Sequence, residues 1–126
     1  MSIFGIGIDI VQIDRMEKMI EKYDDVFAKK VFHLNELNIY KESKHPARFL
    51  AKRFAAKEAF AKAFGTGIVE GITLPNIEVS NNEYGRPFIV LHAKTYDKFR
   101  NSKASSIFLS ISDEKLYAVA QVLIET

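Results

Sequence analysis

Two carboxylates stand in surroundings that do not suit an ordinary surface charge. Asp9 lies in an alternating apolar stretch, and Glu58 lies in an alanine-rich segment with helical spacing. Asp9 shares one side of its stretch with Gly5 and Gly7, whose missing side chains leave room for another group to approach. Mg²⁺ commonly binds one or two protein carboxylates and completes its coordination with water and substrate phosphates. The two residues are therefore a candidate magnesium site, although the sequence gives only their spacing along the chain.

Each carboxylate also has an ordinary structural explanation. Asp9 could mark the end of a strand, and Glu58 could form an exposed (i, i+4) ion pair with Lys62, which contributes roughly 0.3–0.5 kcal/mol. Against this, the helix positions around Glu58 are mostly small, and small flanks let another backbone or a ligand come close. These positions are Ala51, Ala55, Ala61 and Gly65. The basic residues nearby would suit a phosphorylated substrate, and they are Arg53, Lys57 and Lys62.

Periodicity predicts the elements that must position these residues. Residues 3–11 alternate as a strand, with the isoleucines on the side opposite Asp9. A first helix is expected from Asp14, with Glu17 as the reciprocal acid of a capping box. A short helix is expected to begin near Asn35.

The longest predicted element is the helix that contains the alanine-rich segment. Pro46 suits its first turn, and the helix is expected to run to about Phe64. Gly65 and Gly67 are expected to stop it. Its phenylalanines Phe60 and Phe64 would face the core, which leaves the side with Glu58 for another backbone or a ligand.

The second half of the chain predicts two hairpins. Residues 72–91 hold two alternating apolar stretches around a loop with Gly85, and residues 106–125 form a closing hairpin about Asp113. A brief helix is expected near 93–99. A strand, then helices, then mostly antiparallel strands is the order of an α+β fold.

Composition limits the class of protein. The chain has 126 residues, 48% apolar and 27% charged, which predicts one folded domain over residues 1–126. A net charge of +2 is too small to indicate nucleic acid binding, and the absence of cysteine excludes disulfides and thiolate chemistry. The N-terminal residues have no readable signal peptide or membrane span, so a cytoplasmic protein is expected.

Four segments of the chain, in order, resemble holo-acyl-carrier-protein synthase, the short type of 4′-phosphopantetheinyl transferase. They are GIGIDIVQIDR, FLAKRFAAKEAFAKAFGTGI, YGRPFI and LSISDEKLYAVAQVLIE. The resemblance implies the fold of that family, a mostly antiparallel sheet packed on a long central helix. It also implies transfer of phosphopantetheine from coenzyme A to a serine of apo acyl carrier protein, with release of adenosine 3′,5′-bisphosphate, in support of fatty acid biosynthesis. Family members of this length form trimers, with coenzyme A in clefts between subunits.

The resemblance assigns catalytic roles to three residues. Asp9 and Glu58 match the carboxylates that hold Mg²⁺ against the coenzyme A diphosphate, and Lys62 matches a lysine near those phosphates. Glu58 is also a candidate base for the serine proton, although the metal alone could lower the barrier. The residues that match the coenzyme pocket are Arg53, Lys57, Lys62, Gly65, Gly67, Arg86 and Pro87.

The first helix is the expected contact for the acyl carrier protein, which is small and acidic. Arg15 matches the family arginine at that contact, and Lys18 and Lys22 add positive charge. Met16 and Met19 would supply an adaptable apolar anchor. The alternative is that the methionines belong to the core and the basic residues are merely solvated.

One position departs from the family pattern, and two other readings of the whole chain stay open. Asp113 stands where many members have a histidine, which puts a phosphate contact there in doubt.

A non-catalytic basic module that docks an acidic protein would explain the charges but not the two embedded carboxylates. A transferase for peptide-synthesis carrier domains would usually resemble two such units fused. The three histidines, His33, His45 and His92, are not at zinc-ligand spacing and are expected to be surface or capping residues.

Overall fold

The computed structural model describes all 126 residues, which form five strands and five α-helices. The strands form a three-stranded antiparallel sheet, in the order β1-β5-β4, and a separate antiparallel hairpin, β2-β3. The elements are β1 (Ile3–Gln12), α1 (Ile13–Tyr23), α2 (Val26–Val31), α3 (Leu34–Lys41), α4 (Pro46–Phe64), a 3₁₀ turn (Leu74–Asn76), β2 (Ile77–Asn81), β3 (Pro87–Leu91), α5 (Ala93–Arg100), β4 (Ser106–Asp113) and β5 (Tyr117–Glu125).

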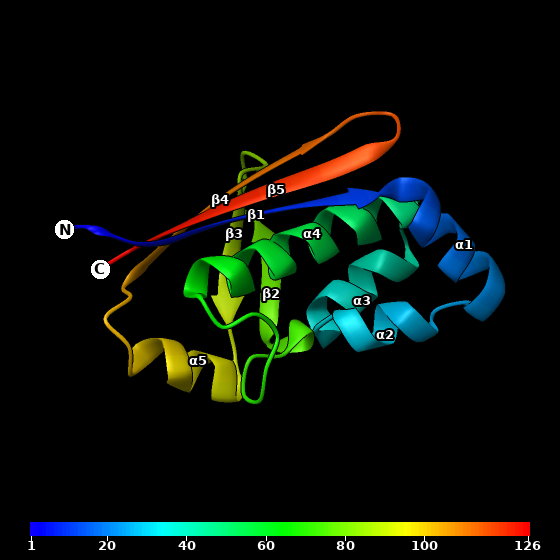
Figure 1. Cartoon of the computed structure of the whole chain (residues 1–126). Coiled ribbons are helices and arrows are strands. Elements are labelled where there is room, and N and C mark those ends of the chain that lie inside the picture. The colour runs from blue at the N-terminus through cyan, green and yellow to red at the C-terminus, as the bar shows by residue number, and fades with distance from the viewer.

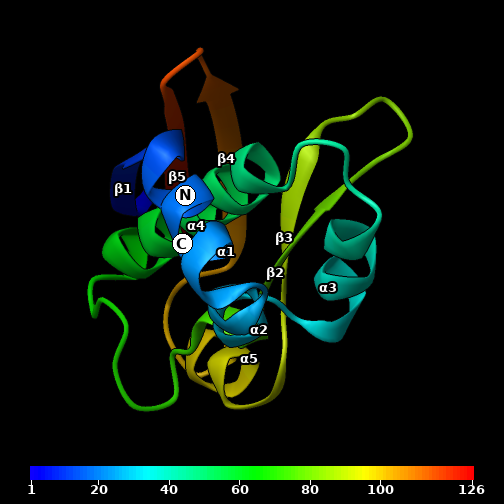
Figure 2. The same cartoon turned by 90° about the vertical axis from the view of Figure 1, so that its right-hand side faces the viewer.

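The long helix α4 is the centre of the molecule. The three-stranded sheet covers one side of it, and the smaller helices lie on the opposite side (Figure 1). The hairpin β2-β3 stands beside α4, with α3 on its far side (Figure 2). This arrangement confirms the predicted α+β fold, a mostly antiparallel sheet packed on a long central helix.

Local signals fix both ends of α4 where the sequence predicts them. Pro46 occupies the first turn, where its missing N–H costs no hydrogen bond. Gly65 ends the helix in the left-handed conformation, with φ of 95°, and the N–H of Gly67 donates to the carbonyl of Ala61 at 3.1 Å. The helix bounds are therefore confirmed.

The small residues around α4 serve backbone packing. A Cβ added at Gly5 would overlap the carbonyl oxygen of Ala63, and one added at Gly7 would overlap that of Ala59. The group that approaches the two glycines is therefore α4 itself. Glu58 itself is half-buried and Lys62 is exposed, whereas the alanines that flank Glu58 are fully buried: Ala51, Ala55 and Ala61.

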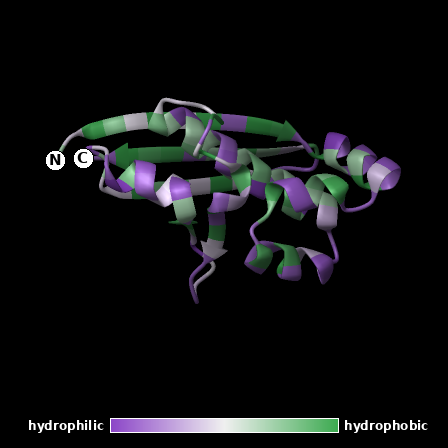
Figure 3. Ribbon diagram, turned by 90° about the horizontal axis from the view of Figure 1, so that it is seen from below, coloured by the Kyte–Doolittle hydropathy of each residue, from purple (hydrophilic) through white to green (hydrophobic).

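The outer face of the three-stranded sheet is apolar and exposed. The ribbons of β1 and β5 are mostly hydrophobic (Figure 3). Ile6, Ile8 and Ile10 are 54%, 59% and 60% exposed, because β1 turns its glycines and Asp9 toward α4. In register, Ile6 lies opposite Leu123 and Ile10 opposite Val119, so the apolar surface continues onto β5.

Three features of the helices differ from the prediction. Helix α2 is an additional element, and α1 begins at Ile13 with Gln12 as its N-cap. The predicted capping box is wrong, because Asp14 lies in the first turn and pairs with Lys18 at 3.1 Å.

None of the helices combines the length and the apolar character needed to cross a bilayer.

Candidate active site

Asp9 and Lys62 meet where β1 crosses α4. The Lys62 Nζ donates to the Oδ1 of Asp9 at 3.0 Å and to the carbonyl of Ile8 at 2.9 Å. The Asp9 side chain is 18% exposed and that of Lys62 is 52% exposed, so the pair lies at the surface with its carboxylate partly buried. Asp9 reaches the helix because the alternation of β1 turns it to the same side as Gly7.

Glu58 lies one turn before Lys62 on the same side of α4. Burial raises the pKa of Glu58, and the negative charge of Asp9 raises it further, while Lys62 opposes both effects. Asp9 is therefore close enough to Glu58 for the two charges to interact. The structure brings together the three residues to which the sequence assigned catalysis, Asp9, Glu58 and Lys62.

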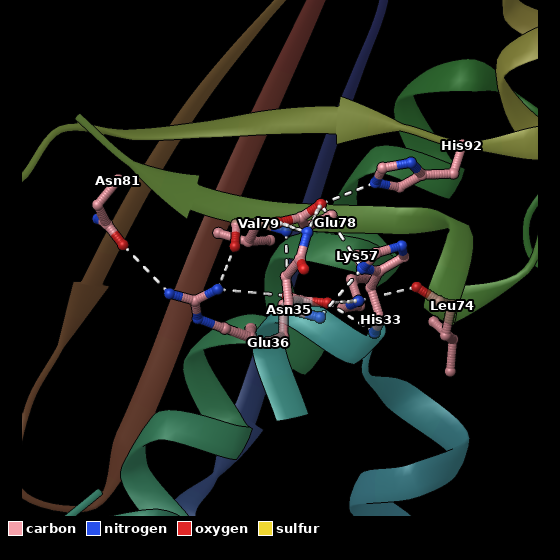
Figure 4. Close-up of polar contacts among 10 residues, drawn as sticks. His33, Asn35, Glu36, Lys57, Leu74, Glu78, Val79, Asn81 and His92 are labelled. Carbon is pink, nitrogen blue, oxygen red and sulfur yellow. Dashed lines mark hydrogen bonds and ion pairs between the residues drawn. The ribbon is translucent and has the colours of Figure 1, made fainter. Parts of the chain in front are cut away.

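Two of the predicted phosphate contacts lie instead in a buried network around Glu36 (Figure 4). Glu36 is fully buried and accepts hydrogen bonds from the Nζ of Lys57 at 2.6 Å and the N–H of Val79 at 3.0 Å. It also accepts from Arg53 at 3.4 Å and from the backbone N–H of His33 at 3.0 Å. Sequence reasoning missed Glu36, whose signal is its position three residues after the helix cap His33.

In this structure Lys57, a predicted phosphate contact, is not accessible to a phosphate. Its side chain is 0% exposed, and its ammonium is held by Glu36 and by the carbonyl of Leu74 at 2.8 Å. Burial lowers the pKa of Lys57 to about 8, although the charge of Glu36 opposes this shift. Arg53 donates to the carbonyl of Val79 and to Asn81 at 3.2 Å, with part of its surface facing a cavity.

That cavity has a volume of about 330 Å³ and lies between α4, the β2-β3 hairpin and β4. Its lining includes Arg48, Lys52, Arg53, Asn81, Pro87 and Ile111. Asp113 stands at its edge, where its Oδ2 accepts from Arg48 at 2.7 Å and its Oδ1 lies 3.7 Å from Lys52. Neither Asp9 nor Glu58 lines this basic cavity, and β1 and β4 are opposite edges of the sheet.

Comparison with known proteins decides the family. The family model of the 4′-phosphopantetheinyl transferase superfamily matches residues 5–121. The chain belongs to this superfamily.

The relatives of this transferase are holo-[acyl-carrier-protein] synthases. The one from Aliivibrio fischeri (strain MJ11) is 46% identical over 126 residues, which is 100% of both chains. The crystal structure of the one from Neisseria meningitidis matches with a TM-score of 0.94 at 36% identity, over 98% of this chain and 99% of that chain. The crystal structure of the one from Bacillus anthracis, solved in complex with CoA (3′,5′-ADP), matches with a TM-score of 0.83 at 38% identity. The match covers 100% of this chain and 99% of that chain. These matches confirm the predicted family resemblance along the whole chain.

The other predicted pocket residues of the transferase lie in two places. Gly65 and Gly67 form the end of α4, one turn beyond Lys62. Arg86 is exposed in the loop after β2, and its N–H donates to Asn82 at 3.0 Å. Pro87 begins β3 and lines the basic cavity. The structure brings the glycines near Lys62, whereas Pro87 lines the basic cavity and Arg86 lies in the adjacent loop.

Helix α1 of the transferase carries three exposed basic residues on one side, with Asp14, Glu17 and Glu21 exposed next to them. Arg15, Lys18 and Lys22 are exposed, and Met19 is half-buried beside them at a shallow depression. Met16 is 1% exposed and belongs to the core, which is the alternative that the sequence left open for the methionines. The helix puts Met16 on the face toward the rest of the molecule, whereas the basic residues point away.

Proposed function

We propose that this chain transfers the 4′-phosphopantetheine group of coenzyme A to a serine of apo acyl carrier protein and releases adenosine 3′,5′-bisphosphate, in support of fatty acid biosynthesis. The observation that carries the proposal is the meeting of Asp9, Glu58 and Lys62 in a chain of this family. Two carboxylates and an ammonium at the surface suit a substrate that carries a diphosphate and a metal ion.

The donor set fits Mg²⁺. Both side chains offer carboxylate oxygens, the ligands that Mg²⁺ prefers, and few protein ligands leave positions for water and phosphate. The charge of Asp9 raises the pKa of Glu58, and a divalent cation would relieve this repulsion. Asp9 and Glu58 would hold the ion, which supplies positive charge to the diphosphate oxygens.

The remaining chemistry is positioning, charge stabilisation and one proton transfer. The serine oxygen bonds to the phosphorus that carries the pantetheine, and the bond from that phosphorus to the bridging oxygen breaks. Adenosine 3′,5′-bisphosphate leaves with the bonding pair. Lys62 stabilises the negative charge on the phosphates, and Glu58 accepts the serine proton.

The proposed active site forms between subunits of a homotrimer. Within one chain the carboxylates lie on the β1 side of α4, whereas the basic cavity with Arg48 and Lys52 lies on the β4 side. The exposed isoleucines of β1 offer an apolar surface through which a neighbour could bring its cavity to these carboxylates. We therefore assign Arg53, Arg86 and Pro87 to the 3′-phosphoadenosine end of coenzyme A.

A charged residue in this apolar surface tests the trimer. Ile8→Glu should give a monomer by sedimentation and should lose transfer, because a buried carboxylate without a partner opposes association. Asn101→Glu, at an exposed position after α5, is the control and should remain a trimer. A wild-type chain that sediments as a monomer at every concentration yet transfers phosphopantetheine would contradict the subunit arrangement.

The carrier protein docks on α1. Its acidic surface would meet Arg15, Lys18 and Lys22, and Met19 would provide the apolar contact.

The decisive experiment is a transfer assay. The protein is incubated with coenzyme A, Mg²⁺ and an apo carrier protein, and the carrier is weighed by mass spectrometry. We expect one phosphopantetheine to be added, and we expect Asp9→Asn and Glu58→Gln each to nearly abolish the addition while the circular dichroism spectrum is retained. No addition under conditions in which a known transferase works would leave the chain as a basic binding module. Full activity of both variants would remove the metal site.

A further inference from the structure

Three residues from distant parts of the chain converge at the ends of three elements. His33 is the N-cap of α3, Glu78 lies in β2, and His92 immediately precedes α5. The two imidazole rings stack with centroids 4.1 Å apart and planes 15° apart. The Nε2 of His92 lies 2.7 Å from the Oε1 of Glu78, and the Nδ1 of His33 lies 3.7 Å from the same oxygen (Figure 4).

The charge of Glu78 interacts with the buried cations Arg53 and Lys57, but neither makes a direct ion pair with it. The Glu78 side chain is 11% exposed, and its ion-pair partners are the two histidines, which are charged only when protonated. Asn35 donates its amide to Oε1 at 3.3 Å and to Oε2 at 3.4 Å, which fixes the carboxylate without neutralising it. At neutral pH a cation at this position would balance a nearly buried negative charge.

The geometry is close to that of a three-residue zinc site. One ligand atom from each of the three side chains lies within 4.8 Å of the others. Ligand atoms in a tetrahedral shell with bonds of about 2.0–2.1 Å lie about 3.3 Å apart. The distances from Glu78 to His92 and to His33, 2.7 Å and 3.7 Å, bracket that value. The two stacked imidazole rings must rotate apart to bind one ion, because a metal lies in the plane of each ring that coordinates it.

We propose that His33, Glu78 and His92 bind a zinc ion, with water in the fourth position. Two imidazoles and one carboxylate favour Zn²⁺ over Mg²⁺, which prefers oxygen ligands. The histidine side chains are 27% and 30% exposed, so the ion can enter from solvent. A metal on the Nδ1 of His33 replaces one exposed hydrogen bond, which that atom accepts from the N–H of Asn35 at 3.2 Å.

The ion is structural and separate from the transfer site. It ties α3 to the β2-β3 hairpin and to the start of α5. His33 also donates its backbone N–H to Glu36, so the ion stiffens the same region that holds Arg53 at the edge of the basic cavity. None of its ligands belongs to the Asp9 and Glu58 pair.

The test is a zinc titration of the untagged, chelator-treated protein against a chromophoric competitor. We expect one Zn²⁺ per chain, unaffected by excess Mg²⁺, and a rise in melting temperature with zinc. His33→Ser and His92→Gln should each weaken binding by at least about tenfold and remove the thermal shift. Serine keeps a good N-cap on α3, and glutamine keeps a donor for Glu78, so both variants should fold.

Two control variants distinguish zinc binding at this cluster from zinc binding by other side chains of the chain. His45→Asn removes a histidine outside the cluster, Asp9→Asn removes a carboxylate of the transfer site, and both should bind zinc like the wild type. Substitution with Co²⁺ should give the visible absorption of a tetrahedral site in the wild type but not in His92→Gln. Absence of stoichiometric zinc binding, or binding that survives both cluster variants or depends on Asp9, would overturn the proposal.

Discussion

The ammonium of Lys62 lies 3.0 Å from the Oδ1 of Asp9. Lys62 itself lies one turn after Glu58 in α4. Without a metal or substrate, this contact neutralises one of the two carboxylates. Lys62 is therefore both a partner for Asp9 and a cation for the proposed phosphate substrate. The two roles oppose each other, because a metal ion on Asp9 competes with the ion pair.

Replacing Lys62 should separate these two roles. Lys62→Met removes the competitor for Asp9, so Mg²⁺ should bind more tightly, while kcat should fall about a hundredfold through loss of phosphate stabilisation. The measurements are Mg²⁺ binding by calorimetry and single-turnover transfer. Lys52→Met, which removes a half-buried lysine on the same helix away from Asp9, should leave Mg²⁺ binding unchanged. Weaker Mg²⁺ binding in Lys62→Met would show that the lysine orients Asp9 instead of competing for it.

Glu58→Gln should raise the free energy of unfolding at neutral pH in the absence of metal. Burial and Asp9 raise the pKa of Glu58 above its ordinary value of 4.5, so the folded protein holds this proton more tightly than the unfolded chain. Stability therefore falls as pH rises from the unfolded pKa through the folded pKa, and it stays lower above that window. Glutamine carries no charge to desolvate.

Urea unfolding across the acid and neutral range measures this effect. The gain in free energy of unfolding from Glu58→Gln should be largest at neutral pH. It should vanish below about pH 4, where Glu58 of the wild type is protonated and carries no charge, like glutamine. A variant that is less stable than the wild type at neutral pH would mean that Glu58 makes a favourable contact with Lys62 that outweighs its burial.

Lys57→Met should destabilise the fold by about 3 kcal/mol, because it leaves the buried charge of Glu36 with fewer partners. The measurement is the midpoint of urea unfolding, with Lys52→Met as the half-buried control, for which we expect a change within about 0.5 kcal/mol. A Lys57→Met protein of wild-type stability with a raised KM for coenzyme A would instead support the phosphate contact predicted from sequence.

Asp113→Asn should tighten the binding of coenzyme A. The Asp113 carboxylate now holds Arg48 at 2.7 Å and attracts Lys52, and its loss leaves both cations free for a phosphate. We expect up to about a fivefold gain in affinity by calorimetry, smaller at high salt. Asp113→His, which restores the residue of many family members, should give at least the same gain. Weaker binding in both variants would mean that Asp113 orients Arg48 for the substrate.

The sequence predicts the parts of this fold that depend on local signals. Pro46 and Gly65 define α4 through the backbone preferences of those two residue types alone. Strand alternation correctly places Asp9 on the side opposite Ile8 and Ile10. The resemblance then supplies the pairing of Asp9 with Glu58, which no spacing in the chain could provide.

The differences from the prediction concern residues whose environment comes from distant segments. Lys57 and Met16 look exposed on their own helices, but β2 with α3 and the packing around α1 bury them. The link between His33 and His92 spans the whole of α4 and the hairpin, so no ligand spacing in the sequence indicates it. Gly5 and Gly7 leave room for a neighbouring group, as the sequence predicts, and that neighbour is the backbone of α4.

The contact at Gly5 and Gly7 has a consequence for how this site can change during evolution. Because β1 meets α4 there without intervening side chains, direct backbone contact sets the spacing of the two backbones that carry Asp9 and Glu58. Core side chains elsewhere can be exchanged without moving one carboxylate relative to the other. A register slip of one residue, in contrast, would direct isoleucines at the helix and turn Asp9 to the outer face. The site therefore tolerates drift in the core but no insertion or deletion in the first strand.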